Sequence, residues 1–277
     1  MTDLFGKSDA ARLRSHLRLL DGPAKIYRLA DVRSAIKDLT PVRRARTGLR
    51  MLRSKGQSDE TTIIERLAVD CSKTFIEFGF HPAEFNCATL ARRHDWDGLL
   101  VDGDAGQVAD AKFFLPSRIA AVQKFLTLDN IDFLKAVFPA LGVLSIDVDG
   151  NDYWFLERLI DIRPAVICVE YNSTFGQAPI SVPYDPGFDR HEKHPRGWYH
   201  GASLTALAWL CRKHGYGLAA VSDGGANAFF TAGGRLDPAH AWRPNRFREI
   251  YSGVSHDLQW QAVKDLPFVD VTCTKSD

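Results

Sequence analysis

The feature that most constrains the fold of this chain is an alternation, between Thr74 and Thr231, of short apolar segments with segments of helical periodicity. The short segments are apolar on both faces, which is typical of strands buried in a parallel sheet between two layers of helices. We therefore predict a Rossmann-like, doubly wound α/β fold. The predicted strands are 74–79, 98–104, 122–127, 142–149, 164–172, 216–223 and 227–232, and the predicted helices are 83–94, 130–140, 151–160 and 203–215.

Only a few turn residues, 223–226, separate the last two predicted strands. Such a short connection joins antiparallel neighbours, whereas parallel strands need a long crossover. The sheet is therefore predicted to be mainly parallel, with an antiparallel strand at one edge.

The sequence divides into two predicted regions, an N-terminal helical region (1–68) and a Rossmann-like domain (69–277). Between residues 12 and 55, thirteen lysines and arginines face only three aspartates. This basic stretch could contact an anionic surface, or its charges could simply be solvated helix faces. Within the larger domain, residues 173–201 form a long irregular insertion with four prolines, which is typical of a lid.

The overall composition argues against several classes of protein. The 277 residues carry a formal net charge of only +1, which gives no strong field for nucleic acid. The five cysteines are odd in number and form no CxxC pair, which favours reduced thiols. We find neither a leader sequence nor an apolar run of the ~20 residues that a membrane span needs. A cytoplasmic protein without a transmembrane segment is expected.

Acidic side chains follow five of the predicted strands. Ligands of doubly wound sheets bind outside the carboxyl ends of the strands, so these acids are expected to meet at one rim. Converging carboxylates repel one another unless a cation or hydrogen-bond donor compensates them. An organic cation with sugar hydroxyls, or a divalent metal, would do so. The strand ends are Glu77-Phe-Gly79, Asp102-Gly-Asp104, Asp129-Asn130, Asp147-Val-Asp149 and Glu170-Tyr171-Asn172.

Structural explanations compete with function at several of these positions. Asp149 and Asp152 are placed to cap the helix that follows them, and Asp129 could cap the helix that opens at Asn130. Glu77 could pair with Arg92 or Arg93. Asp147 lies inside the strand end, where capping does not explain it.

With these residues in place, the segment from about Thr74 to Thr231 resembles the class I S-adenosylmethionine (SAM) dependent methyltransferases, and among them the FkbM-like proteins. The resemblance rests on "FIEFGFHPAEFN", "WDGLLVDGD", "LSIDVDGNDYW", "VICVEYNSTFG", "VPYDP", "YHGASLTALAWL" and "NAFFTA". It implies a seven-stranded sheet with an antiparallel last strand.

The resemblance also implies roles for individual residues. Glu77 and Gly79 would hold the amino-acid part of SAM, Asp102 its ribose, and Asp129 with Asn130 its adenine, while Asp147 would face the reacting methyl group. One departure stands in the turn after the first strand, which reads Gly79-Phe80-His81-Pro82 where the family has further glycines. Pro82 removes an N–H donor, so a turn of different shape is expected.

Methyl transfer to a hydroxyl needs a place for its proton. His81 or His200 could act as the general base. Alternatively, Asp147, Glu170 and Asn172 could hold Mg²⁺, as an acid/acid/Asn set does in some O-methyltransferases of this class by resemblance. Predicted acceptor contacts are Asp149, Tyr171, Tyr184 and Tyr199, because aromatic faces and polar edges suit a sugar ring. FkbM-like proteins commonly modify glycans or natural products, so O-methylation of a saccharide is expected.

Two other functions remain open from the sequence. Asp147-Val148-Asp149 could bind a metal and the diphosphate of a nucleotide sugar, as in a glycosyltransferase. A methyltransferase-like module without catalytic activity could instead bind a partner through the basic N-terminus. The sequence does not indicate an oligomeric state.

Overall fold

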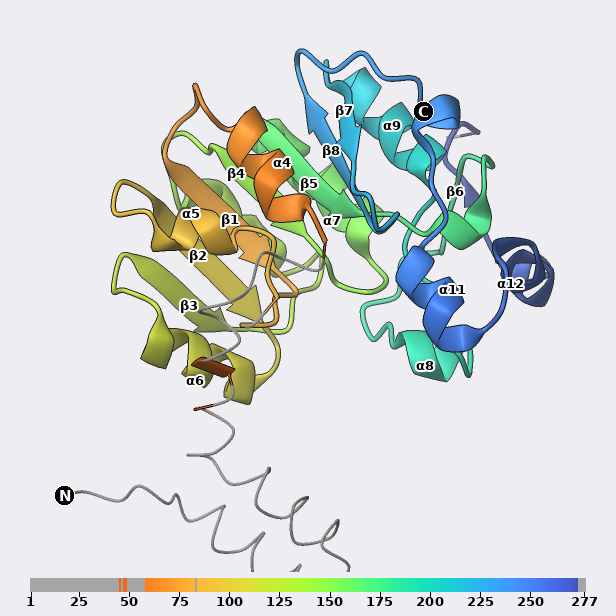
Figure 1. Cartoon of the computed structure of the whole chain (residues 1–277), viewed down its shortest axis with the longest axis horizontal. Helices are drawn as coiled ribbons and strands as arrows, with labels where there is room; N and C mark the ends of the chain where they lie inside the picture. The colour runs from red at the N-terminus through yellow and green to blue at the C-terminus, as the bar shows by residue number, and fades with distance from the viewer. Residues whose placement is uncertain (1–44, 46, 49–57, 83, 274–277) are drawn as a thin grey trace, which may run out of the picture. The chain divides into compact units, whose positions relative to one another are not determined.

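The computed structural model describes residues 45, 47–48, 58–82 and 84–273 (Figure 1). Most of the basic N-terminal region lies outside the described residues, so its contact with an anionic surface stays a prediction. The compact unit that holds the sheet spans Lys55–Asp277. It includes helix α4 (Glu60–Leu67), which contacts β5 and β8 of the sheet.

Seven strands form one sheet in the order β3-β2-β1-β4-β5-β8-β7 (Figure 1). Strands β1 to β5 are parallel, and β8 pairs antiparallel with both β5 and β7. The predicted Rossmann-like sheet with antiparallel pairing at one edge is therefore confirmed. Its strands are β1 (Thr74–Phe78), β2 (Asp97–Asp102), β3 (Ile119–Gln123), β4 (Val143–Ile146), β5 (Val166–Glu170), β7 (Gly217–Val221) and β8 (Asn227–Thr231).

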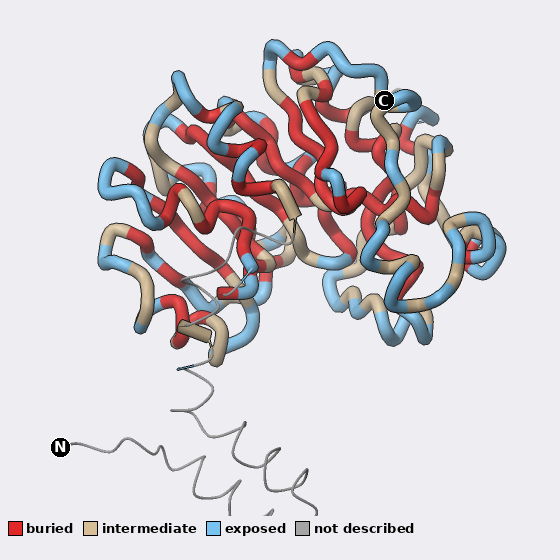
Figure 2. The backbone as a smooth tube through the Cα atoms, viewed as in Figure 1, coloured by how far each residue is buried: buried red, intermediate tan, exposed pale blue. Residues whose placement is uncertain are grey.

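Side-chain alternation along the strands divides the core into two layers. In β1, Phe75 points into one layer and Ile76 and Phe78 into the other, because successive side chains leave opposite faces. The strands are accordingly buried along most of their length (Figure 2). The first layer contains helices α4, α5 (Ala88–Arg92) and α6 (Ala105–Phe114), and the second contains α7 (Asp152–Leu159) and α9 (Leu204–Lys213).

Three sequence predictions need correction around β3. The strand begins at Ile119, three residues before the predicted start, because Ile119 is the partner of Gly98 in β2. Helix α6 was not predicted, since its apolar side chains form no single stripe. The predicted helix at 130–140 shortens to the 3₁₀ helix η1 (Ile131–Ala136), which ends well before Pro139.

The insertion 173–201 packs against the C-terminal part of the chain. Phe175, Val182, Trp198, Tyr199 and Val263 form a third apolar cluster, and β6 pairs antiparallel with β9. The insertion is therefore packed against the residues that follow β8, and its role as a lid stays a prediction. The elements concerned are η3 (Ser173–Phe175), β6 (Ile180–Ser181), α8 (Arg190–Lys193), α10 (Pro238–Ala241), α11 (Arg246–Ser252), α12 (His256–Val263) and β9 (Val269–Asp270); η2 (Ile160–Ile162) follows α7.

Among the described residues, no helix combines the length and the apolar character that crossing a bilayer requires. The five cysteines are all free thiols, and three of them are buried.

A close approach of two backbones fixes the junction between β1 and β4. Gly79 has a φ of +75°, and a Cβ at this position would lie 1.5 Å from the carbonyl oxygen of Asp147. The amide of Asp147 in turn donates to the carbonyl of Phe78 at 3.1 Å. Only glycine permits both the conformation and the contact.

We expect Gly79→Ala to lower the free energy of unfolding by about 3 kcal/mol or more, because it adds a steric clash to an unfavourable φ. Gly215→Ala is the matched control, since Gly215 has a φ of +83° but a Cβ added there would meet nothing within 4 Å. It should cost about 1–2 kcal/mol for the backbone alone. Urea unfolding of both variants measures the difference, and equal losses would show that the contact with Asp147 is unimportant.

Candidate functional site

A cleft of about 750 Å³ opens at the carboxyl ends of β1, β2, β4 and β5. This is the end of a doubly wound sheet where ligands bind. Seven predicted site residues line it, namely Glu77, Gly79, His81, Asp102, Asp147, Asp149 and Glu170. Acids from four of the five predicted strand ends thus converge on this cleft, whereas Asp129, after the third strand, does not line it.

Glu77 faces inward from β1 and fastens the turn that follows it. Its two carboxylate oxygens accept hydrogen bonds from the backbone amides of Asn86 (2.7 Å) and Cys87 (2.8 Å). Burial raises the pKa of Glu77 to about 6, and the two amide bonds lower it in part. Glu77 therefore pairs with neither Arg92 nor Arg93, and it holds the backbone of Asn86 and Cys87 beside the end of β1.

Asp102 ends β2 on the opposite wall. One of its oxygens accepts from the amide of Asp104 at 2.7 Å, and Asp104 caps α6 by accepting from Gln107 at 2.8 Å. Burial raises the pKa of the half-exposed Asp102. The exposed ring of Phe125 lies beside Gly103, so this wall offers a carboxylate and an aromatic face together.

The three aspartates after β4 have different environments. Asp152 is fully buried and accepts from the amides of Val148 and Gly150, both at 2.9 Å, so it shapes the turn before α7. Asp149 does not cap this helix; it has a φ of +56° and forms an ion pair with Arg190. Asp147 is half-buried, and no donor of the described residues reaches its carboxylate.

The environment of Asp147 disfavours its negative charge. Burial and the carboxylates of Glu170 and Asp149 raise its pKa well above the ordinary value. A bound cation would relieve this repulsion. Arg190 offsets part of this repulsion through its charge, but no donor of the described residues hydrogen-bonds to the Asp147 carboxylate.

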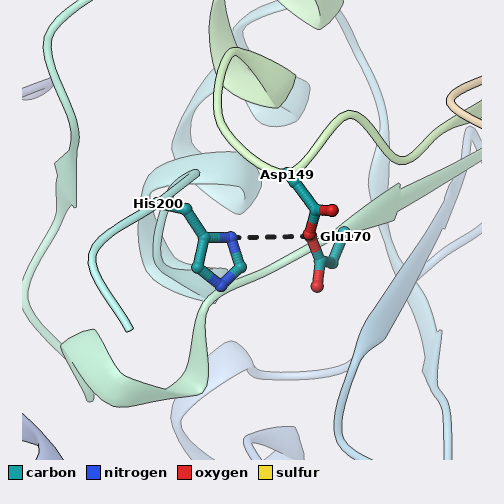
Figure 3. A group of neighbouring side chains, drawn as sticks. All are labelled: Asp149, Glu170 and His200. Carbon is teal, nitrogen blue, oxygen red and sulfur yellow. Dashed lines mark ion pairs between the residues drawn. The ribbon is translucent and has the colours of Figure 1, made fainter. Parts of the chain in front are cut away.

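Glu170 and His200 meet at the inner end of the cleft (Figure 3). The Nδ1 atom of His200 lies 3.6 Å from a Glu170 carboxylate oxygen, too long for a hydrogen bond. The His200 side chain is 1% exposed and that of Glu170 12%, and neither of the two facing atoms has a hydrogen-bond partner among the described residues. Asp149 also points toward them, and the three residues offer ligand atoms within 4.8 Å of one another.

Arg248 of α11 contacts His200 and two residues beside it, Asn172 and Thr174. Its guanidinium donates to the side-chain oxygens of Asn172 (2.6 Å) and Thr174 (3.0 Å), and it contacts Nε2 of His200 at 2.8 Å. Burial lowers the pKa of Arg248 to about 10, so it remains a cation at neutral pH. Burial, together with Arg190 and Arg248, lowers the pKa of His200 well below its ordinary value.

The Mg²⁺ ligand set predicted from the sequence does not fit the structure. The Asn172 side-chain oxygen already accepts from Arg248 and from the amide of Thr174 (3.0 Å). Its side-chain nitrogen donates to the carbonyls of Trp198 and His200. Asn172 therefore fixes the insertion to β5 and has no oxygen to offer beside Asp147 and Glu170.

Several other predicted site residues lie away from the cleft. The Tyr171 hydroxyl donates to the carbonyl of Arg243, that of Tyr199 donates to Pro267, and that of Tyr184 accepts from the amide of Leu128. Asn130 closes the turn after β3 through Thr127 and Phe125. The three tyrosines, Asp129 and Asn130 are accordingly absent from the cleft lining, and of the predicted acceptor contacts only Asp149 is part of it.

Some residues that line the cleft were not predicted. Arg190 and Phe188 come from the insertion, and Asn245, Phe247 and Arg248 come from the part of the chain that follows β8. Arg190 follows Asp189, which caps α8. This capping residue was the one signal in the local sequence for a helix that begins at Arg190. Nothing in the sequence around Arg248 indicates that it reaches a histidine 48 residues away.

Comparison with known proteins adds the following findings. No protein-family model and no curated protein sequence matches this chain. Similar solved structures include the N-terminal domain of EvdMO1 with SAH bound (TM-score 0.40, 11% identity, 62% of this chain and 77% of that one). Others are a putative O-methyltransferase from Klebsiella pneumoniae (0.40, 13%, 81% and 88%) and the methyltransferase domain of bacterial-CtHen1-C (0.42, 19%, 64% and 98%).

We expect Glu77→Ala to lower the free energy of unfolding by about 2 kcal/mol or more, because two buried amides lose their acceptors. Glu77→Gln should cost less, since it keeps one acceptor and no longer buries a charge. Glu84→Ala, on an exposed position of the same turn, is the control. Urea unfolding at neutral pH gives the ranking, and a Glu77→Ala protein as stable as the control would contradict this role for Glu77.

Proposed function

We propose that this chain is a SAM-dependent methyltransferase that methylates a hydroxyl group of a sugar, glycan or related natural product. The observation that carries the proposal is the Asp147 carboxylate, to which no described donor hydrogen-bonds, beside the glycine turn at the carboxyl end of a parallel sheet. A small organic cation is the ligand that such a site stabilises.

The residues around the cleft fit SAM in three respects. Its volume of about 750 Å³ lies within the range of small-molecule sites. Asp102 at the end of β2 is placed to accept from ribose hydroxyls, with the ring of Phe125 available to an aromatic base. Asp147 would face the cationic end. SAM would supply a methyl group bound to a positively charged sulfur.

Glu77 has a second role besides the one that the resemblance implies. Each of its oxygens accepts from a backbone amide, so it would support the cofactor by fastening the segment after the turn. Each oxygen keeps a second lone pair, so a direct bond to the amino group of SAM stays part of the proposal.

The opposite half of the cleft supports a polyhydroxylated acceptor. Phe188 and Phe247 provide aromatic faces, and Asp149, Glu170 and Arg190 provide polar edges. This combination suits a sugar ring, which has apolar faces and hydroxyl edges. A nucleotide sugar fits less well, because its diphosphate would meet the acids, and Asp149 is already paired with Arg190.

We expect the full chain to bind SAM in isothermal titration calorimetry. Asp147→Asn should weaken SAM binding at least tenfold, about 1.4 kcal/mol. Binding of SAH, whose sulfur is neutral, should weaken less, because only SAM places a positive charge at that atom. Asp129→Asn is the matched control, being exposed and outside the cleft.

The same titrations separate the alternatives. If Asp147→Asn weakened the binding of SAM and of SAH by the same factor, Asp147 would contact a part of the ligand other than the sulfur. Binding of a nucleotide sugar without SAM would support a glycosyltransferase. Binding of neither would support a module without methyltransferase activity.

The ribose assignment makes an independent prediction. Asp102→Asn should weaken SAM and SAH by the same factor, again about tenfold, because the ribose is common to both. 2′-Deoxyadenosine analogues of SAH should lose little further affinity in this variant. An unchanged affinity of Asp102→Asn for both ligands would overturn the assignment.

A further inference from the structure

Beside the cleft, two buried polar atoms face each other, and no other group of the described part of the chain hydrogen-bonds to either of them. They are Nδ1 of His200 and a carboxylate oxygen of Glu170, 3.6 Å apart (Figure 3). A buried polar atom without a partner is costly, so such a pair calls for an explanation. Either a metal ion belongs between them, or a proton on one atom faces the other.

Arg248 decides between these explanations. A guanidinium can only donate hydrogen bonds, and it lies 2.8 Å from Nε2 of His200. Nε2 must therefore act as the acceptor and carry no hydrogen. The neutral imidazole then holds its proton on Nδ1, the atom that points at Glu170.

This tautomer is unsuited to a metal. A histidine that binds a metal through Nδ1 normally donates from Nε2 to a second group. Here the second group is itself a cation with nothing to accept that hydrogen. Arg248 cannot easily withdraw, because Asn172 and Thr174 also hold it. Arg190, paired with Asp149, adds a second positive charge beside the three candidate ligands.

We propose that Arg248 and His200 are positioning residues, and that they hold Glu170 as the metal-free proton acceptor for the acceptor hydroxyl. The proposal rests on the methyltransferase function for the identity of the hydroxyl, whereas the tautomer and the geometry are independent of it. In the step concerned, the O–H bond of the acceptor breaks, its proton binds a Glu170 carboxylate oxygen, and the electron pair stays on the acceptor oxygen.

His200, which the sequence offers as the base, does not fit that role. It is buried, it is not among the residues that line the cleft, and its one basic nitrogen is occupied by Arg248. Glu170 does line the cleft. Burial and the charges of Asp149 and Asp152 raise the pKa of Glu170 to about 8, which suits a base that works near neutral pH.

The first test is the tautomer of His200 in the full chain labelled with ¹⁵N-histidine. The ring signals are assigned by their loss in His200→Gln. We expect Nδ1 to carry the proton at neutral pH, and Zn²⁺ or Mn²⁺ to leave the signals unshifted and unbroadened. A proton on Nε2, or a site-specific shift or broadening by either metal, overturns the proposal.

The second test uses two substitutions of His200, each of which keeps a hydrogen-bonding group at the position of one ring nitrogen. The amide nitrogen of His200→Asn can take the place of Nδ1 and donate to Glu170. His200→Gln reaches the position of Nε2, where it can accept from Arg248 but leaves Glu170 without a donor. We expect the pKa of Glu170, followed by ¹³C NMR of its carboxylate, to rise by about one unit in His200→Gln relative to His200→Asn, because a donor favours the charged form.

The other charges around Glu170 are the same in both variants, so they do not produce this difference. They are Asp147, Asp149, Asp152, Arg190 and Arg248. Equal Glu170 pKa values in the two variants, or a Glu170 that titrates near the ordinary ~4.3, would overturn the proposal. Thermal unfolding checks that both variants fold. If either variant does not fold, Arg248→Lys replaces it: this variant keeps a cationic donor, so His200 should retain its proton on Nδ1.

Calorimetry with SAM on the same samples separates this proposal from the proposed function. A chain that binds no SAM but shows the Nδ1 tautomer and the Asn/Gln difference would remove the methyltransferase function and leave the assignment of Arg248, His200 and Glu170 intact. A chain that binds SAM but carries the His200 proton on Nε2 would support the methyltransferase function and overturn the assignment of Arg248, His200 and Glu170.

Discussion

Electrostatic repulsion among carboxylates at the ends of β1, β4 and β5 is the constraint on which the rest of the site depends. The acids differ in how their negative charge is compensated. Glu77 and Asp152 accept from backbone amides, and Asp149 pairs with Arg190. Asp147 has no donor among the described residues, and Glu170 has only a distant one. Asp147 and Glu170, to which no described donor hydrogen-bonds, face the cleft from the neighbouring strands β4 and β5. Repulsion between carboxylates is therefore relieved at Glu77, Asp152 and Asp149, and it remains where a bound ligand could relieve it.

The segments outside the sheet supply the positive charge that this arrangement needs. Arg190 comes from the insertion and Arg248 from helix α11. The third apolar cluster joins the insertion to the part of the chain that follows β8. The cleft lining therefore mixes acids from four strand ends with the cations Lys124, Arg190 and Arg248. A cationic cofactor and a neutral polyhydroxylated acceptor would both find acids to contact there.

The sequence was informative where local rules apply and silent where the fold brings distant segments together. Buried strands alternating with helices were enough to predict the sheet and the rim at which Glu77, Asp102, Asp147 and Glu170 meet, because parallel strands end on the same side. The tyrosines were assigned to the acceptor from composition alone. In the structure their hydroxyls satisfy backbone groups, as a buried Tyr hydroxyl must. The roles of Arg190 and Arg248 depend on contacts across 41 and 48 residues, which no local pattern encodes.

The same limitation applies to the metal ligand and the general base that the sequence predicts. From the sequence, Asn172 offers an oxygen ligand and His200 a basic nitrogen. In the structure one guanidinium engages both of them, at 2.6 Å and 2.8 Å. A single cation therefore removes the third metal ligand, takes the lone pair of the imidazole, and directs the remaining proton of His200 toward Glu170. The chemistry of the inner cleft follows from where Arg248 lies, because a donor that cannot accept fixes the hydrogen-bond direction of every group it touches.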